Sequence, residues 1–342
     1  MSRERETSKT PNCPKQIEVT APRCFTMVNK PVLYLAVLCM VGVVATRLFE
    51  GIVVLSSTKG VSRETSSSIH GKPPAFPSFN KSGVMLFYHI PKSGGTSIRK
   101  FLGPKKVNVV RAMYKSELES CKERIGMVLN GTRTERLFAE LHGDIPGIPE
   151  LHNSIAEWRR LSAESGVPFF AFTVVREPIS FHRSYFMHFH GPKCTDDWCE
   201  KEIYAINEEN FVRSLQPNQQ CRELFHGQRE EKRNSPATPL HDPKRNCAEV
   251  QHLLESDWDW VGTTERMQKV TLPLLTKILF DNETMGLVAT RRNYKTHYSR
   301  LSNISETAQQ QVRQQAEFDL EIYDHWAEKE FNIASRLQFP VV

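Results

Sequence analysis

The sequence lacks several patterns that would assign it to a common functional class. Its 342 residues include eight cysteines but no C-x2-C pair, so the close ligand spacing of a structural zinc site is missing. The formal net charge is +6, and the basic residues are scattered rather than gathered in the blocks typical of nucleic-acid binding. No internal repeat is present. We therefore expect neither a metal nor a nucleic acid as a partner.

Long apolar runs are also scarce, and one run is a candidate membrane span. Residues 32–46 read VLYLAVLCMVGVVAT without a charge, and Leu48 and Phe49 extend the run if Arg47 reaches toward the interface. A membrane-crossing helix needs about 20 apolar residues, or about 17 at the shortest. More lysines and arginines precede the run than closely follow it, which places the N-terminus in the cytosol. The alternative is a buried core helix.

These flanks predict a single-pass type II membrane protein with a signal-anchor. The predicted parts are a cytosolic tail (1–30), a transmembrane signal-anchor (31–55), a stem (56–82) and a lumenal domain (83–342). The stem is rich in Ser, Lys, Gly and Pro, as linkers often are. Glycosylation sequons follow the span at Asn80, Asn130, Asn282 and Asn303. We therefore expect a lumenal glycoprotein.

Short apolar runs alternate with helical patterns in the lumenal part. The predicted strands are residues 84–90, 107–111, 136–141 and 169–175. Helices are expected from Ile98 and from Ile179, and residues 304–337 indicate a long amphipathic helix or helix pair. This alternation predicts an α/β fold with a mostly parallel, P-loop-like sheet flanked by helices. The polar, proline-containing stretch 215–248 is predicted to be a long loop.

The first predicted strand leads into the sequence PKSGGTS, which we call the phosphate loop (residues 91–97). Its candidate ligands are Lys92, Ser93, Gly94, Gly95, Thr96 and Ser97. The two glycines let backbone N–H groups approach an anion, and the N-terminus of the following helix adds partial positive charge. The lysine precedes both glycines, whereas a Walker A motif places it after the second. This order, without an evident acidic metal ligand, argues against a P-loop kinase.

Two stretches together resemble a known family. The stretch FYHIPKSGGTSIRKFL (87–102) resembles the 5′-phosphosulfate loop of Golgi carbohydrate sulfotransferases, the group that contains heparan sulfate 2-O-sulfotransferase. The stretch FTVVREPISFHRSYF (172–186) is similar to the 3′-phosphate motif of that group, with Arg176 at a strand end and Ser184 eight residues later. Residues 260–266 and 318–323 are similar as well. The resemblance covers roughly residues 84–331.

The resemblance implies transfer of a sulfuryl group from PAPS (3′-phosphoadenosine 5′-phosphosulfate) to a carbohydrate hydroxyl, without a metal. It implies a Golgi membrane location with the catalytic domain in the lumen. Lys92 would neutralise the bridging oxygen as 3′,5′-ADP leaves. A late loop would close over the nucleotide, with Arg291 and Lys295 as candidate contacts. The acceptor, a glycosaminoglycan or another glycan, stays open, as does homo-oligomerisation.

The resemblance also indicates a catalytic base. The group uses a histidine at a strand end for this role, and His142 has that place. The local pattern departs from the family, because Leu141 replaces a small or polar residue and a glycine follows the histidine. Glu140 and Asp144 are the alternatives. His89, inside the first predicted strand, is expected to be a packed core residue.

Cysteine pairing and two rival functions complete the expectations. In an oxidising lumen exposed thiols tend to pair, and the sequence spacing favours Cys194–Cys199 and Cys221–Cys247. Cys121 would then be free or would link two subunits. The rival functions are a catalytically inactive, membrane-tethered nucleotide- or glycan-binding protein with the same fold and a P-loop kinase-like phosphotransferase.

Overall fold

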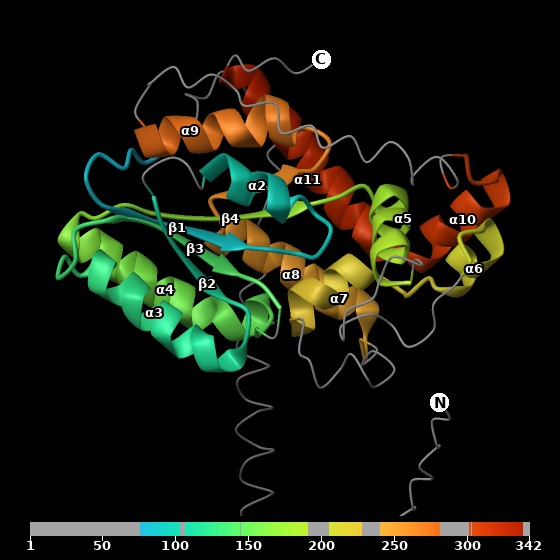
Figure 1. Cartoon of the computed structure of the whole chain (residues 1–342), viewed down its shortest axis with the longest axis horizontal. Helices are drawn as coiled ribbons and strands as arrows, with labels where there is room; N and C mark the ends of the chain where they lie inside the picture. Colours follow the sequence, from blue (N-terminus) through green and yellow to red (C-terminus); the bar gives the residue numbers. More distant parts are fainter. Residues whose placement is uncertain are drawn as a thin grey trace, which may run out of the picture. The chain divides into compact units, whose positions relative to one another are not determined.

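A computed structural model of the chain describes residues 76–102, 107–143, 145–190, 205–227, 240–280, 301 and 303–337. The chain divides into two compact units, Met1–Gly71 and Lys72–Val342, and the described residues all belong to the second (Figure 1). The predicted cytosolic tail and signal-anchor lie outside the described residues, as does most of the stem. Other predicted residues outside them are Asp144, Cys194, Cys199, Asn282, Arg291 and Lys295.

A parallel sheet of five strands forms the centre of the second unit. The strands are β1 (Gly83–Tyr88), β2 (Asn108–Ala112), β3 (Arg136–Leu141), β4 (Phe169–Val175) and β5 (Trp260–Thr263). Their order across the sheet is β2-β3-β1-β4-β5, and all neighbouring pairs are parallel. Strands β1, β4 and β5 are buried along their whole length, which explains their continuous apolar sequences. Four of the five strands are confirmed predictions.

Helices cover both faces of this sheet, and each face has its own apolar core. The helices are α2 (Gly95–Leu102), α3 (Lys115–Leu129), α4 (Ile148–Ser165), α5 (Pro178–Phe189), α6 (Glu208–Arg213), α7 (Gln219–His226), α8 (Pro243–Asp257), α9 (Leu272–Phe280), α10 (Glu306–Gln315) and α11 (Glu317–Arg336), with a π-helical turn η2 (Met267–Thr271) before α9. Helices α3 and α4 lie below the sheet in Figure 1, and α2 and α9 lie above it. Side chains alternate along β1, so that Leu86 joins the core with α3, α4 and α8 while Phe87 joins the core with α2 and α9.

Helix α11 connects the parts of this unit. Ile322 and Trp326 belong to the core on the α3 and α4 side, and Ala334 belongs to the opposite core. Glu330 is buried and accepts hydrogen bonds from the backbone N and the Oγ1 of Thr263 in β5, at 3.1 and 2.6 Å. The predicted helix pair at residues 304–337 is thus confirmed as α10 and α11.

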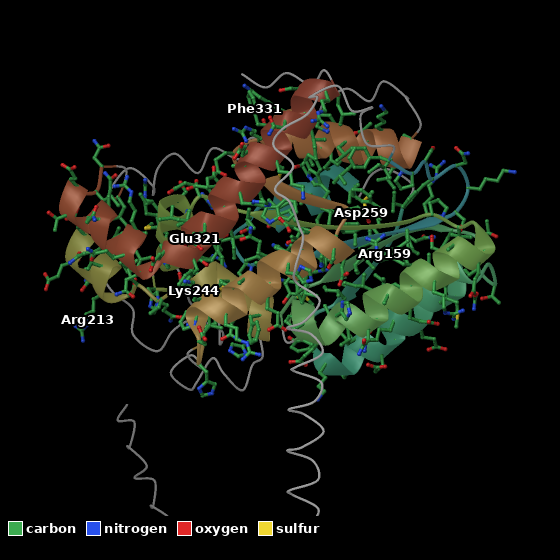
Figure 2. All side chains as sticks on the ribbon, turned by 180° about the vertical axis from the view of Figure 1, so that it is seen from behind. Arg159, Arg213, Lys244, Asp259, Glu321 and Phe331 are labelled. Carbon is green, nitrogen blue, oxygen red and sulfur yellow. A yellow bond between two sulfur atoms is a disulfide. The ribbon has the colours of Figure 1, made fainter. Side chains whose placement is uncertain are left out.

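A partly exposed ion pair holds the residue before β5 against the sheet. Asp259 Oδ2 accepts hydrogen bonds from the backbone N of Ala171 at 2.8 Å and from Nη2 of Arg159 at 3.1 Å. Figure 2 shows Arg159 and Asp259 close together on the side of α4. The guanidinium of Arg159 also lies over the ring of Phe169, 5.4 Å from its centre. These contacts join β4, β5 and α4.

The fold predicted from the sequence needs correction at three places. Within the described part of the chain, no helix is both long enough and apolar enough to cross a bilayer. The predicted transmembrane helix is therefore not among the helices found. Its residues, 31–55, lie outside the described part. Packing also begins before residue 83, because Phe79 is buried and its backbone N bonds to the carbonyl of Ile278. Finally, the predicted loop at 215–248 contains α7 and the start of α8.

Candidate active site

The phosphate loop lies at the carboxyl end of β1, the central strand. The chain leaves β1 toward the edge strand β2, whereas the connection from β3 passes to β4 on the other side of β1. Strand order reverses at this position, and ligands of open α/β sheets bind in the crevice outside the strand ends at such a point. Because β3 and β4 both pair with β1, the residues that follow these three strands are neighbours.

The phosphate loop turns sharply and starts a helix. Lys92 has φ 65° and Gly94 has φ 88°, a region that glycine enters easily and lysine does not. The backbone N–H groups of Ser97 and Ile98 both donate to the carbonyl of Gly94, at 2.9 and 3.2 Å, so α2 begins here. The first N–H groups of a helix have no partner within it. The loop therefore has the backbone geometry expected of an anion site.

Two side chains add to this anion site. Burial and the neighbouring Arg176 charge lower the pKa of Lys92 to about 8. A bound anion would favour the charged form of this lysine. Ser93 is fully buried, and its Oγ has no hydrogen-bond partner among the described residues. An unpartnered buried hydroxyl is costly unless a ligand satisfies it, so these side chains suit the binding of an anion.

Arg176 follows β4 and contacts the phosphate loop directly. Its Nη1 donates to the carbonyl oxygen of Lys92 at 2.9 Å. Gln220 of α7 holds the backbone of Arg176 on both sides, accepting from its N at 2.9 Å and donating to its O at 2.7 Å. Ser184 is buried on α5, the helix that starts directly after Arg176 and Glu177. The structure thus brings Lys92 and Arg176 together and places Ser184 on the adjoining helix.

His142, the predicted base, follows β3. Its backbone N donates to the carbonyl of Ala112 at 3.0 Å, and its Nδ1 lies 3.1 Å from the carbonyl oxygen of His89. Burial, with a smaller effect of His89, lowers the pKa of His142 to about 3. The ring is therefore neutral at pH 7. Since a carbonyl can only accept, Nδ1 carries the proton and Nε2 is the basic atom.

The glycine that departs from the family pattern has a local explanation. Gly143 has φ 87°, and a Cβ at this position would lie 2.6 Å from the carbonyl oxygen of Met113. A side chain could not fit there without moving the backbone at Met113, the residue that follows β2. The turn that presents His142 therefore requires glycine at residue 143.

Glu140, the alternative base, is enclosed by basic groups. Its carboxylate is fully buried, 2.8 Å from Nδ1 of His89 and 2.9 Å from Nε of Arg111. Nε of Arg99 lies 3.7 Å away. This arrangement is unsuited to proton abstraction from a substrate, because the carboxylate is committed to protein donors. His89 is buried as expected, but its polar partner was missed by sequence reasoning.

Sequence reasoning also missed the support behind Arg176. Asp319 of α11 is buried and accepts the backbone N–H groups of Gln220 and Cys221, at 3.0 and 2.7 Å. It thereby satisfies the N-terminus of α7, the helix that carries Gln220. Burial raises the pKa of Asp319 to about 6. Asp319 lies in the stretch 318–323 noted above, which was the available signal.

The disulfide predicted for this region is confirmed. Cys221 and Cys247 are bonded, with a Cα–Cα distance of 5.7 Å, and they join α7 to α8. Cys121, a residue of α3, is free and buried in the core. Burial raises the pKa of its thiol to about 12, so it does not offer a thiolate for a link between subunits.

Comparisons with known proteins add little to this geometry. No family model matches the chain, and no curated protein matches it. It is similar to the crystal structure of APE1195 with 18% identity and a TM-score of 0.21, over 28% of this chain and 62% of that one. It is also similar to the solution structure of the de novo designed PLOOP2X3_50 fold protein, with 13% identity and a TM-score of 0.20, over 31% and 72% of the two chains. Scores this low support no argument.

Proposed function

We propose that this protein is a PAPS-dependent O-sulfotransferase that acts on a carbohydrate hydroxyl. The observation that carries the proposal is the hydrogen bond from Arg176 to the carbonyl of Lys92, which joins the phosphate loop to the arginine after β4. PAPS has two anionic groups, the 3′-phosphate and the 5′-phosphosulfate, on different positions of its ribose. A site for it therefore needs two cationic positions held at a fixed separation.

The residues divide between these two groups. Lys92, the Ser93 hydroxyl and the N-terminus of α2 would hold the 5′-phosphosulfate. Arg176 and Ser184 would hold the 3′-phosphate, with Gln220 fixing the backbone of the arginine. PAPS, when bound, supplies the sulfuryl group and leaves as 3′,5′-ADP. Arg291 and Lys295 remain predicted contacts from the late loop.

Two side chains would carry the chemistry. Nε2 of His142 would take the proton of the acceptor hydroxyl while the acceptor oxygen bonds to sulfur and the bond from sulfur to the phosphate oxygen breaks. Lys92 would stabilise the negative charge that develops on that phosphate oxygen. Neither step requires a metal ligand from the chain.

Retention on immobilised 3′,5′-ADP, followed by transfer of labelled sulfate from PAPS to a panel of glycans, tests the proposal. We expect retention that free 3′,5′-ADP competes away and ATP does not, and label on at least one glycan. Binding without transfer to any acceptor would favour the inactive binding protein. Competition by ATP, with transfer of phosphate, would favour the kinase-like alternative.

We propose further that the protein works in an oxidising compartment, the lumen of the Golgi. The Cys221–Cys247 disulfide supports this location, because disulfides are rare in the cytosol. The sequon residues Asn80, Asn130 and Asn303 are all exposed. A mobility shift after enzymatic removal of N-glycans from the full-length protein is the expected result. An unglycosylated protein with free Cys221 and Cys247 in cells would contradict it.

A further inference from the structure

A buried acid–histidine pair lies between the phosphate loop and His142. Glu140 is fully buried in β3, and His89, directly after β1, is 5% exposed. The two residues are joined by the 2.8 Å contact between Oε1 of Glu140 and Nδ1 of His89. Two arginines, Arg99 of α2 and Arg111 of β2, complete the surroundings of the carboxylate. The pair is not part of the function described above.

The charge state of Glu140 fixes the proton on His89. Burial alone would raise the pKa of Glu140, but the hydrogen bond from His89 and the charges of Arg99 and Arg111 hold it below its usual value. The carboxylate is therefore ionised and can only accept a hydrogen bond. Nδ1 of His89 must carry a proton. Burial lowers the pKa of His89 despite the opposing effect of Glu140, so the ring is neutral.

His89 in turn holds His142 in two ways. Its carbonyl oxygen accepts from Nδ1 of His142 at 3.1 Å, and the two rings stack with centres 4.0 Å apart and planes inclined by 25°. The hydrogen bond selects the tautomer of His142 in which Nε2 is unprotonated. The stacking restricts the direction in which Nε2 points.

The ring of His89 is itself closely confined. The ring of Phe87 stacks on it at 5.2 Å. A Cβ added to Gly95 would lie 2.1 Å from both Cε1 and Nε2 of His89, so the start of α2 lies directly against the ring edge. His89 therefore contacts the phosphate loop on one side and His142 on another. Its orientation relates the position of the bound phosphosulfate to the position of the base.

We propose that Glu140 and His89 are positioning residues that fix the ring orientation of His142. The effect on catalysis rests on the proposed sulfotransferase function, whereas the effect on the ring orientation does not. A base that is misoriented loses turnover more than it loses nucleotide binding. Loss of the pair should therefore lower kcat and leave 3′,5′-ADP binding nearly unchanged.

The experiment compares Glu140→Ala and Glu140→Gln in the full-length protein. The glutamine keeps an oxygen that accepts from His89, and the alanine does not. For Glu140→Ala we expect kcat to fall about 10²-fold, and for Glu140→Gln by less than about tenfold, with 3′,5′-ADP affinity within about threefold in both. Equal losses in the two variants, or wild-type turnover in Glu140→Ala, would overturn the proposal.

A second readout does not depend on activity. Nitrogen-15 NMR of histidine-labelled protein at pH 7 should show His142 protonated at Nδ1 and unprotonated at Nε2. His89→Asn keeps a donor toward Glu140 and the backbone carbonyl that accepts from His142, but it removes the ring that stacks on His142. The His142 signals should therefore shift and broaden while Nδ1 stays protonated. His152→Asn, at a histidine of α4 that pairs with Asp257 near the surface, is the matched control and should leave the His142 signals unchanged.

The kinetic and NMR measurements test the proposed function and the positioning role separately. The NMR comparison also tests the positioning role if Glu140→Ala does not fold. Unchanged His142 signals in His89→Asn would overturn the positioning role. If the wild-type protein transfers no sulfate to any acceptor, the proposed function fails, and the comparison of His142 signals in wild type and His89→Asn still decides whether the pair positions His142.

Discussion

Arg176 and Lys92 are joined by a hydrogen bond of 2.9 Å from a guanidinium nitrogen to a backbone carbonyl, although both side chains are cationic. The arginine charge contributes to the lowered pKa of the lysine, which shows that the two charges oppose each other. An anion between them would relieve this repulsion. Binding of 3′,5′-ADP should therefore stabilise the fold as well as fill the site.

The first prediction concerns Arg176. Arg176→Ala removes a charge-assisted contact to the nucleotide and should weaken 3′,5′-ADP binding by about 1.5–3 kcal/mol. Isothermal titration calorimetry measures this directly. Arg160→Ala, at an exposed arginine of α4 that pairs with Glu157 and Glu164, is the control and should bind normally. Unchanged affinity in Arg176→Ala would remove this residue from the site.

The second prediction separates chemistry from binding at His142. His142→Ala removes the base and should lower kcat by about 10²–10⁴-fold, while affinity for 3′,5′-ADP stays close to wild type. Steady-state kinetics with labelled PAPS, combined with calorimetry, gives both quantities. Near-normal turnover in this variant would require another base.

The third prediction is a pH dependence of stability at Glu330. Burial raises the pKa of this carboxyl from 4.5 to about 7, against the opposing effects of its hydrogen bonds from Thr263 and the charge of Arg266. Because the folded pKa is the higher one, the stabilising contribution of the proton is complete below pH 4.5 and is lost as pH rises through 7. Glu330→Gln removes this titration. Its stability relative to wild type should rise by up to about 3 kcal/mol between pH 4.5 and 7.5.

Urea unfolding at several pH values tests this prediction. Glu321→Gln, at an exposed position on the same helix (Figure 2), should show no such trend. If the free energies of unfolding of Glu330→Gln and wild type differ by a constant amount across the pH range, the raised pKa of Glu330 is contradicted.

The fourth prediction links the disulfide to the nucleotide site. The Cys221–Cys247 bond closes a loop with a sequence separation of 26 residues, which corresponds to roughly 3 kcal/mol on the chain-entropy model. Replacing both cysteines with serine should lower the free energy of unfolding by about that amount. It should also weaken 3′,5′-ADP binding, because Gln220, beside Cys221, holds Arg176.

Unfolding and binding are measured on the same preparation. Cys121→Ala lowers stability through a cavity but leaves the disulfide intact, and we expect normal nucleotide affinity in that variant. Wild-type affinity in the double serine variant would show that α7 keeps its place without the bond.

The sequence predicted the parts of this fold that depend on local signals. Short, mainly apolar runs predicted β1 to β4, and the Gly-Gly turn before Ile98 predicted the start of α2. Strand β5 has four residues, too few for a periodicity, and it is a strand because it pairs with β4. Helix α7 is polar, and its N-terminus is satisfied from α11 by Asp319. Tertiary contacts of this kind leave no local pattern.

The residues of the candidate site likewise divide into those predicted from local sequence signals and those that depend on tertiary contacts. Lys92 and Arg176 follow recognisable strands, so their meeting at one edge of the sheet could be predicted. Glu140 and His89 could not be paired from the sequence, because their contact depends on the register that places Phe87 opposite Glu140. The sequence alone does not show whether an ionisable residue inside a predicted strand faces solvent, packs in the core or pairs with another ionisable residue. That depends on which residue the neighbouring strand places opposite it.

Helix α11 supports two remote parts of the molecule through two carboxylates. Asp319 holds α7, and thereby Arg176, while Glu330 holds β5 eleven residues later in the same helix. On the proposed function, a genetic selection for loss of nucleotide binding should therefore recover alleles in α11, far along the chain from the phosphate loop and from Arg176. In a phenotype assay such alleles would resemble substitutions in the proposed nucleotide site, although they would alter residues that support the site and do not belong to it.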